Sequence, residues 1–184
     1  AQLAFEELVR VGGFERRILV IAMPTGSGWL DPAGHDPLEY MHRGDVATVA
    51  IQYSYLQSWL SVVVDPTQGL REAAALVDMV YRHWRDLPED ERPRLYLHGL
   101  SLGAFLSQST VPLLDVLGDP FDGALWAGSP FLSDFWRHVV KRREPASPAW
   151  RPRFGNDSLI RTTNQANVLD REETREMHDR RRYW

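Results

Sequence analysis

The sequence contains no cysteine and no long apolar run among its 184 residues. Without cysteine there can be no disulfide framework, no thiolate metal site and no cysteine nucleophile. A membrane-spanning helix requires roughly 20 consecutive apolar residues, whereas the densest apolar stretch covers only residues 59–64. We therefore expect a soluble chain that does not itself cross a bilayer.

The charge pattern lacks the features of a nucleic-acid-binding protein. The formal net charge is −4, with acidic residues in excess before residue 134 and basic residues in excess after it. Nucleic-acid binding favours basic residues gathered on one face together with a recognisable reading module, and neither is evident. The three arginines at 180–182 are typical of a solvated end. We expect no nucleic-acid partner.

Patterns for metal ions and nucleotides are missing as well. His35, Asp36 and His42 do not have the spacing that places two ligands on one face of a helix. A glycine pair follows the first apolar run, but Asp31 stands where the third glycine of a dinucleotide fingerprint belongs, and no Gly-Lys-Ser/Thr follows. The expectation is that the chain holds neither a metal nor a cofactor.

The length and composition favour one globular domain over residues 1–184. Hydrophobic residues make up 43% and charged residues 25% of the chain, which is the usual balance of a folded globule. The first residues include no initiator methionine, no basic region and no sustained apolar core. We interpret this start as that of a fragment from which upstream sequence has been removed.

Short apolar runs alternate along the chain with helical patterns. Continuous apolar runs predict buried strands at residues 18–23, 46–51, 94–98 and 121–127. Helices are expected at 36–42, with Asp36 as cap and Pro37 at the first position, after Ser101 until a break before Pro112, and at 132–142. The clearest helix covers 67–87, where apolar residues recur every three or four positions: Leu70, Ala74, Val77, Tyr81 and Trp84.

This alternation predicts an α/β fold with a mostly parallel sheet and helices on both faces. Ligands of such sheets bind outside the carboxyl ends of the strands. The loops at 25–29, 53–59, 98–103 and 128–131 each follow a predicted strand. They should therefore share one rim of the molecule.

Gly99-Leu100-Ser101-Leu102-Gly103 is the most informative pattern in the chain. It follows a predicted strand and precedes a predicted helix, as in a nucleophile elbow, where the serine sits on a sharp turn between small neighbours. We predict that Ser101 is a catalytic nucleophile. The alternative is an ordinary loop serine between a strand and a helix.

A serine nucleophile needs amide donors for the oxygen of the acyl group on which charge develops. The backbone amide of Leu102, directly after the serine, is the expected first donor. Thr25 or Gly26, in the glycine-containing loop after the first strand, is the expected second. A plain tight turn is the alternative explanation of that loop.

Other residues near this rim have less specific explanations. His98 lies three residues before Ser101, at the end of a strand, and is better suited to packing or hydrogen bonding than to acting as a base. The loops are rich in aromatic residues, of which at least half are expected in the core. The others can line an acyl or aromatic pocket; the set comprises Trp29, Tyr53, Tyr55, Trp59, Trp126, Phe131, Phe135 and Trp136.

The order of elements, the turn around Ser101 and the loop from Pro24 to Trp29 resemble the α/β-hydrolase fold. The chain is more specifically similar to a bacterial α/β-hydrolase family whose catalytic domain is the carboxy-terminal part of a predicted membrane protein. The resemblance implies a serine hydrolase of small-molecule esters or lipids, membrane-associated through an amino-terminal transmembrane region outside this sequence. It rests on segments 24–32, 38–40, 44–50, 52–56, 59–61 and 123–126.

The chain departs from this fold in its later part. The catalytic acid and histidine of α/β hydrolases follow the serine on loops after later strands, yet only one strand is predicted after Ser101. His138, on a predicted helix, and His178, in the charged end segment, are more typical of surface residues, and Asp134 of a helix cap. The fold therefore appears truncated, and we expect a missing carboxy-terminal segment to act as covalent or noncovalent partner.

Three functions are compatible with these residues. The leading hypothesis is a serine esterase or lipase-like hydrolase that forms an acyl-enzyme on Ser101. A noncatalytic α/β-hydrolase-like interaction domain, which keeps the elbow only as a structural turn, is the second. An acyltransferase using the same serine is the third, and it differs only in the acceptor of the acyl group.

Overall fold

A computed structural model describes residues 1–53, 66–111, 118–131, 133–155, 157 and 159–163. The chain divides into two compact units, Ala1–Pro130 and Phe131–Trp184. The first unit contains the sheet and the turn at residues 99–103, called the GxSxG turn below. That residues 1–184 form a single domain stays a prediction.

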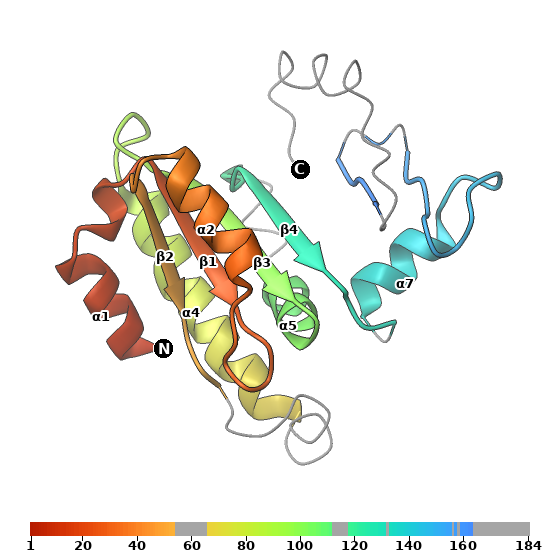
Figure 1. Ribbon diagram of the computed structural model, residues 1–184, viewed down its shortest axis with the longest axis horizontal. Coiled ribbons are helices and arrows are strands. Elements are labelled where there is room, and N and C mark those ends of the chain that lie inside the picture. Colours follow the sequence, from red (N-terminus) through yellow and green to blue (C-terminus); the bar gives the residue numbers. More distant parts are fainter. Residues whose placement is uncertain (54–65, 112–117, 132, 156, 158, 164–184) are drawn as a thin grey trace. The chain divides into compact units, whose positions relative to one another are not determined.

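The first unit is built on a parallel sheet of four strands, as the alternating pattern predicts (Figure 1). Its order is β2-β1-β3-β4, and each neighbouring pair is parallel. The carboxyl ends of all four strands therefore meet at one edge of the sheet. The strands are β1 (Ile18–Met23), β2 (Val46–Ala50), β3 (Arg94–Leu100) and β4 (Gly123–Ala127).

Helices cover both faces of this sheet. One face packs against α1 (Gln2–Arg10), α4 (Pro66–Asp86) and α5 (Leu102–Thr110), and α2 (Pro32–Met41) lies on the other (Figure 1). All six residues of β1 are buried, because alternate side chains enter the two layers. Leu19, Ile21 and Met23 belong to the larger cluster, and Ile18, Val20 and Ala22 to the smaller one.

The observed helices differ from the predicted ones in three respects. α2 begins at Pro32 rather than at Pro37, because the Asp31 carboxylate accepts the Ala33 amide and caps the helix five residues before Asp36. In α4 the buried residue is Ala73 and not Ala74, which is exposed. The pattern analysis did not identify α1, or the short 3₁₀-helix Gly13–Glu15 that follows it.

The second unit contains α7 (Asp134–Lys141). The Ser133 hydroxyl accepts the Trp136 amide and caps this helix. Asp134 is exposed and pairs with Arg137 one turn later, at 2.6 Å. Among the residues that the structure describes, no helix in either unit is both long enough and apolar enough to span a membrane.

Arg92 joins the end of α4 to the start of β3. Its guanidinium donates hydrogen bonds to the backbone carbonyls of Leu87 and Arg85 and pairs with the Asp119 carboxylate at 2.8 Å. It also lies over the Trp84 ring, 5.0 Å from the centroid. The Arg92 side chain is only 15% exposed, so these bonds are shielded from water and should count toward stability.

We predict that Arg92→Met lowers the free energy of unfolding by about 2 kcal/mol, because three acceptors lose a charged donor. Arg82→Met is the matched control, since its single ion pair with Asp78 is exposed and its loss should cost at most about 0.5 kcal/mol. Urea unfolding followed by circular dichroism measures both. Equal stabilities of the two variants would contradict the structural role of Arg92.

Candidate active site

The turn between β3 and α5 holds Ser101 in an uncommon backbone conformation. Its φ is 56° and its ψ is −117°, a backbone conformation that residues other than glycine rarely adopt. The serine is the last residue before α5 and makes no capping hydrogen bond with its own side chain. The chain thus reverses sharply at this residue, as a nucleophile elbow requires.

The two glycines of the turn allow backbones to pack against each other. A Cβ at Gly99 would lie 2.6 Å from the Cα of Ala104 and from the carbonyl oxygen of Gly103. A Cβ at Gly103 would lie 2.5 Å from the Pro24 carbonyl oxygen and closer still to that of Met23. Since every atom met is backbone, neither clash can be relieved by a side-chain rotation.

A backbone hydrogen bond holds Ser101 in place, while its side-chain hydroxyl is left without a bond to the described residues. Its amide donates to the Ala127 carbonyl at 2.8 Å, which extends the contact between β3 and β4 to the turn itself. The residue is partly exposed. Within the described part of the chain, its Oγ has no hydrogen-bond partner.

Leu102 is the first residue of α5. The amide of a first helical residue has no acceptor within its own helix, and it lies at the positive end of the helix dipole. The position of Leu102 is therefore suited to bind an oxygen atom that carries negative charge next to Ser101.

The loop after β1 is held by bonds within its own backbone. The Thr25 amide donates to the Trp29 carbonyl at 3.0 Å, and the Gly28 amide donates to the Thr25 carbonyl at 2.9 Å. The Thr25 amide must leave its bond to Trp29 before it can bind a substrate oxygen. Gly26, the other expected donor, lies buried between these bonded residues.

Two residues that the sequence did not single out for this role brace the same loop. The Tyr53 hydroxyl donates to the Pro24 carbonyl at 2.9 Å, and burial raises the pKa of that hydroxyl, so it stays protonated as a donor. The side-chain amide of Gln52 donates to the Ser27 carbonyl at 3.3 Å. Gly28 has a φ of +85°, and a Cβ there would strike the Gln52 side chain. No local sequence pattern predicts these contacts.

His98 packs against His35, as its position at the end of a strand suggests. Their rings meet edge to face with centroids 4.8 Å apart, His98 on β3 and His35 on α2. Neither the buried Nδ1 of His98 nor the buried Nε2 of His35 has a hydrogen-bond partner among the described residues. Burial lowers the pKa of His98, the neighbouring His35 lowers it further, and Asp31 opposes the shift.

The described histidines of the first unit contact residues other than Ser101. His42 bonds to Arg17 at 2.9 Å, and His83 packs against Phe14. In the second unit, His138 is exposed near the Phe154 ring, and Asp134 is turned to its ion pair. His178 lies outside the described residues, as do Tyr55 and Trp59.

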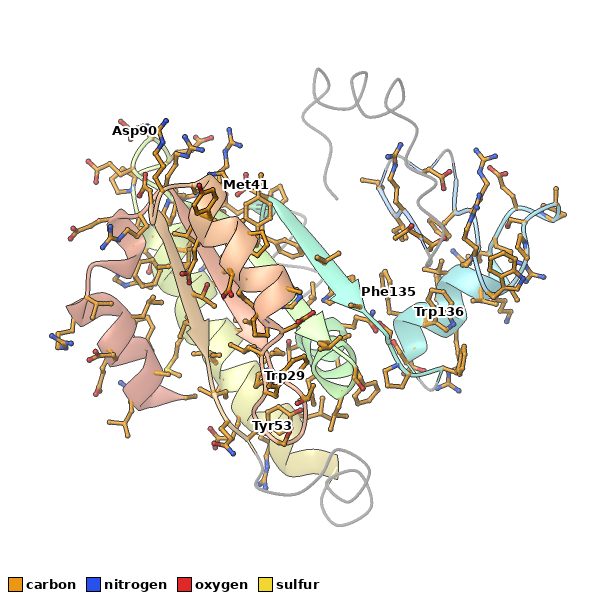
Figure 2. The ribbon with its side chains drawn as sticks, viewed as in Figure 1. Trp29, Met41, Tyr53, Asp90, Phe135 and Trp136 are labelled. Atoms are coloured by element: carbon orange, nitrogen blue, oxygen red, sulfur yellow. The ribbon has the colours of Figure 1, made fainter. Side chains whose placement is uncertain are left out.

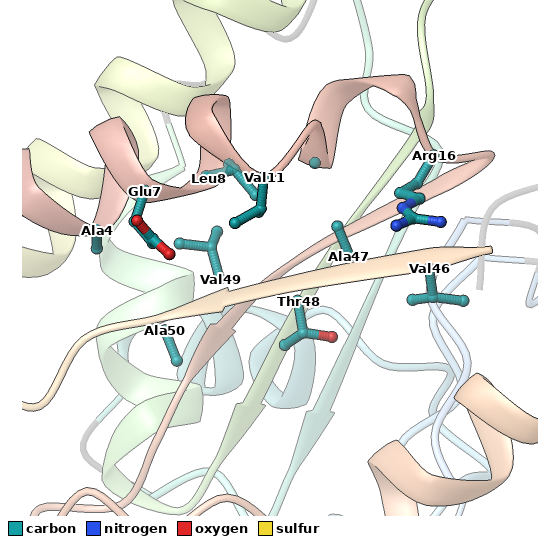
Figure 3. A pocket seen from close by; sticks show the side chains of 11 residues that line it. Ala4, Glu7, Leu8, Val11, Arg16, Val46, Ala47, Thr48, Val49 and Ala50 are labelled. Carbon is teal, nitrogen blue, oxygen red and sulfur yellow. The ribbon is translucent and has the colours of Figure 1, made fainter. Parts of the chain in front are cut away.

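A hollow of about 350 Å³ lies between α1 and the edge strand β2 (Figure 3). Apolar side chains such as Leu8, Val11 and Val49 line it, with Glu7 and Arg16 as the charged groups. No residue of the GxSxG turn contributes to its wall. Across the described ranges, no cluster of three histidine, aspartate or glutamate side chains could hold a metal ion.

Comparison with known proteins gives a match to a family model and matches to solved structures. A family model described as "Alpha/beta-hydrolase family" matches residues 1–184. A solved structure from work on two fungal esterases from Rhizomucor miehei matches with 15% identity and a TM-score of 0.37, over 70% of this chain. The chain spans 41% of the length of that structure. No curated protein matches the sequence.

Gly103→Ala tests the packing of the turn. The new methyl group meets two backbone oxygens, so we expect a loss of about 3 kcal/mol in the free energy of unfolding, or a displaced turn at Ser101. Gly118→Ala is the control, because nothing lies within 4 Å of its Cβ position. Thermal unfolding of both variants measures the difference, and an unchanged Gly103→Ala protein would contradict this packing.

His98 should make stability depend on pH. An unfolded histidine has a pKa near 6.5, and that of folded His98 is lower. Between the two values the unfolded chain binds more protons, so the free energy of unfolding falls as the pH falls through this window. The fall in unfolding temperature from pH 7.5 to 5.5 should be smaller in His98→Gln. In the exposed-site control His138→Gln it should match the wild type, and equal slopes in all three proteins would exclude this role for His98.

Proposed function

This chain belongs to the alpha/beta-hydrolase family, and we propose that it hydrolyses carboxylic esters through an acyl-enzyme on Ser101. The observation that carries the proposal is the backbone of Ser101, with a φ of 56° between a buried strand and the first residue of a helix. Such strain persists only where the surrounding structure enforces it. Ser101, whose hydroxyl has no partner in the described part of the chain, directly follows the carboxyl end of β3, at the edge where ligands of parallel sheets bind.

In the proposed reaction, the Ser101 Oγ forms a bond to the carbonyl carbon of the ester as a base takes its proton. The charge that develops on the carbonyl oxygen is stabilised by the Leu102 amide and by a second amide from the loop after β1. The bond to the alcohol then breaks, and the protonated base returns the proton to the leaving oxygen. Water, activated by the same base, releases the acid and restores the serine.

The second amide is proposed to come from Gly26 or Thr25. Their loop reaches Ser101 because the Pro24 carbonyl packs directly on Gly103. In the Thr25 alternative, the substrate oxygen replaces the Trp29 carbonyl as the acceptor of the Thr25 amide. The Gly26 alternative leaves the bond between Thr25 and Trp29 in place, whereas the Thr25 alternative exchanges that bond for one to the substrate.

We propose that the base is a histidine outside the described residues. His35, His42, His83 and His98 have other neighbours in the first unit. His178 is the histidine of this sequence that lies outside the described part, and sequence beyond these residues is the second source. The similarity to a family of predicted membrane proteins supports the further proposal that the ester is lipid-like and is met near a membrane.

A fluorophosphonate probe tests the nucleophile in the full-length protein. We expect labelling of the wild type, no labelling of Ser101→Ala, and a loss of ester hydrolysis in that variant of about a thousandfold or more. Ser109→Ala is the matched control, because Ser109 lies exposed on the same helix, where its hydroxyl donates to the Phe105 carbonyl. It should be labelled as the wild type is.

Each other outcome of this experiment has a definite meaning. Equal labelling of wild type and Ser101→Ala would place the reactive group elsewhere. A folded but unlabelled and inactive wild type would favour a noncatalytic interaction domain. If acyl groups pass to an added alcohol in preference to water, the protein is an acyltransferase. Loss of labelling in His178→Ala would assign the base to His178, in the charged end segment of this sequence.

A further inference from the structure

We infer that the indole of Trp29 forms a preformed contact surface for the acyl chain of the substrate, so that the preferred esters carry an extended apolar acyl group. The inference rests on the proposed function and adds to it the residue that contacts the acyl chain. It concerns the described loop between β1 and α2, and no part of it depends on the second unit.

Trp29 is exposed at the edge where the candidate nucleophile lies. Its side chain is 51% exposed, although tryptophan is the side chain that gains most by burial. Figure 2 shows Trp29 and Tyr53 beyond the carboxyl ends of the strands, with Met41 and Asp90 at the opposite end of the sheet. The Tyr53 hydroxyl bonds to the first residue of the same loop and Tyr53 is buried, so Trp29 is the aromatic side chain of this pair that a ligand can reach.

The loop presents this indole on a rigid support. The Trp29 carbonyl accepts both the amide and, at 3.4 Å, the hydroxyl of Thr25. The Ser27 carbonyl accepts the Gln52 amide, and Asp31 caps the next helix. A surface that is fixed before the ligand arrives costs little conformational entropy on binding. Since the backbone of Trp29 makes these bonds, a change of its side chain leaves them in place.

The chemistry of the loop favours the acyl chain over the alcohol as the group that contacts Trp29. The leaving alcohol must receive a proton and therefore faces the base. Residues 24–30 are Pro-Thr-Gly-Ser-Gly-Trp-Leu and include no acid or base that titrates near neutral pH. The same loop supplies the proposed amide for the carbonyl oxygen, to whose carbon the acyl chain is directly bonded. An apolar chain that leaves this carbon along the loop meets the indole.

The test compares acyl chain lengths in the full-length protein. For p-nitrophenyl octanoate and p-nitrophenyl acetate, the ratio of the two kcat/KM values isolates the contact with the chain, since the leaving group and the catalytic residues are the same. In Trp29→Ala we expect this ratio to fall about tenfold, because an apolar contact of a few methylene groups is lost. Trp29→Phe should stay within about threefold of the wild type.

Tyr40→Ala is the matched control. Tyr40 is an aromatic side chain of α2 that is 88% exposed, and its loss should leave the ratio unchanged. Trp29→Gln keeps much of the volume and removes the apolar surface, so it replaces Trp29→Ala if that variant does not fold. Hydrolysis of the acetate ester serves in each variant as the measure of an intact active site.

The two proposals fail in different ways. If the wild type is labelled by the fluorophosphonate but the octanoate to acetate ratio is unchanged in both Trp29→Ala and Trp29→Gln, the role of Trp29 is wrong and the proposed function stands. A ratio that falls equally in Tyr40→Ala also contradicts the inference. If the folded wild type is neither labelled nor active, the proposed function fails and the role of Trp29 in binding an acyl chain fails with it.

Discussion

At Gly103 the backbone of α5 comes so close to the end of β1 that a Cβ would stand 2.5 Å from the Pro24 carbonyl oxygen. This approach fixes where α5 begins, and with it the conformation of Ser101 and the position of the Leu102 amide. It also places the loop after β1 beside the turn. Ser101 and the proposed second oxyanion donor come from segments more than 70 residues apart, and this contact between backbones holds those segments next to each other.

The surrounding structure holds both sides of that contact. The Tyr53 hydroxyl and the Gln52 amide support the loop after β1, and the Ala127 carbonyl accepts the amide of Ser101. On the other face of the sheet, the His35 ring on α2 meets the His98 ring on the same strand that leads to the serine. Strain of this kind at one residue is stable only when several neighbours enforce it, and here they come from the segment after β2, from β4 and from α2.

Much of the fold could be predicted because the pattern is local. The run at 18–23 contains only apolar residues and becomes β1 with the predicted bounds, and Pro112 follows the end of α5 as expected. The start of α2 was predicted five residues too late, because Asp36-Pro37 and Asp31-Pro32 carry the same capping signal. Which of the two aspartates caps the helix is decided only when the helix packs in the folded protein. α1 was not predicted, although Ala4, Phe5 and Leu8 have helical spacing and pack in the core. Its nine residues are shorter than the windows over which apolar periodicity is reliable.

For the candidate site, the sequence by itself determined which residue is the nucleophile candidate, because Gly99, Ser101 and Gly103 are neighbours whose spacing reflects a local steric requirement. The tertiary structure decided what surrounds it. The bond of the Thr25 amide to Trp29, the support from Gln52 and Tyr53, and the pairing of His98 with His35 join residues distant in the chain. Such contacts form only when the sheet brings the carboxyl ends of its strands together, and no periodicity in a single segment encodes them.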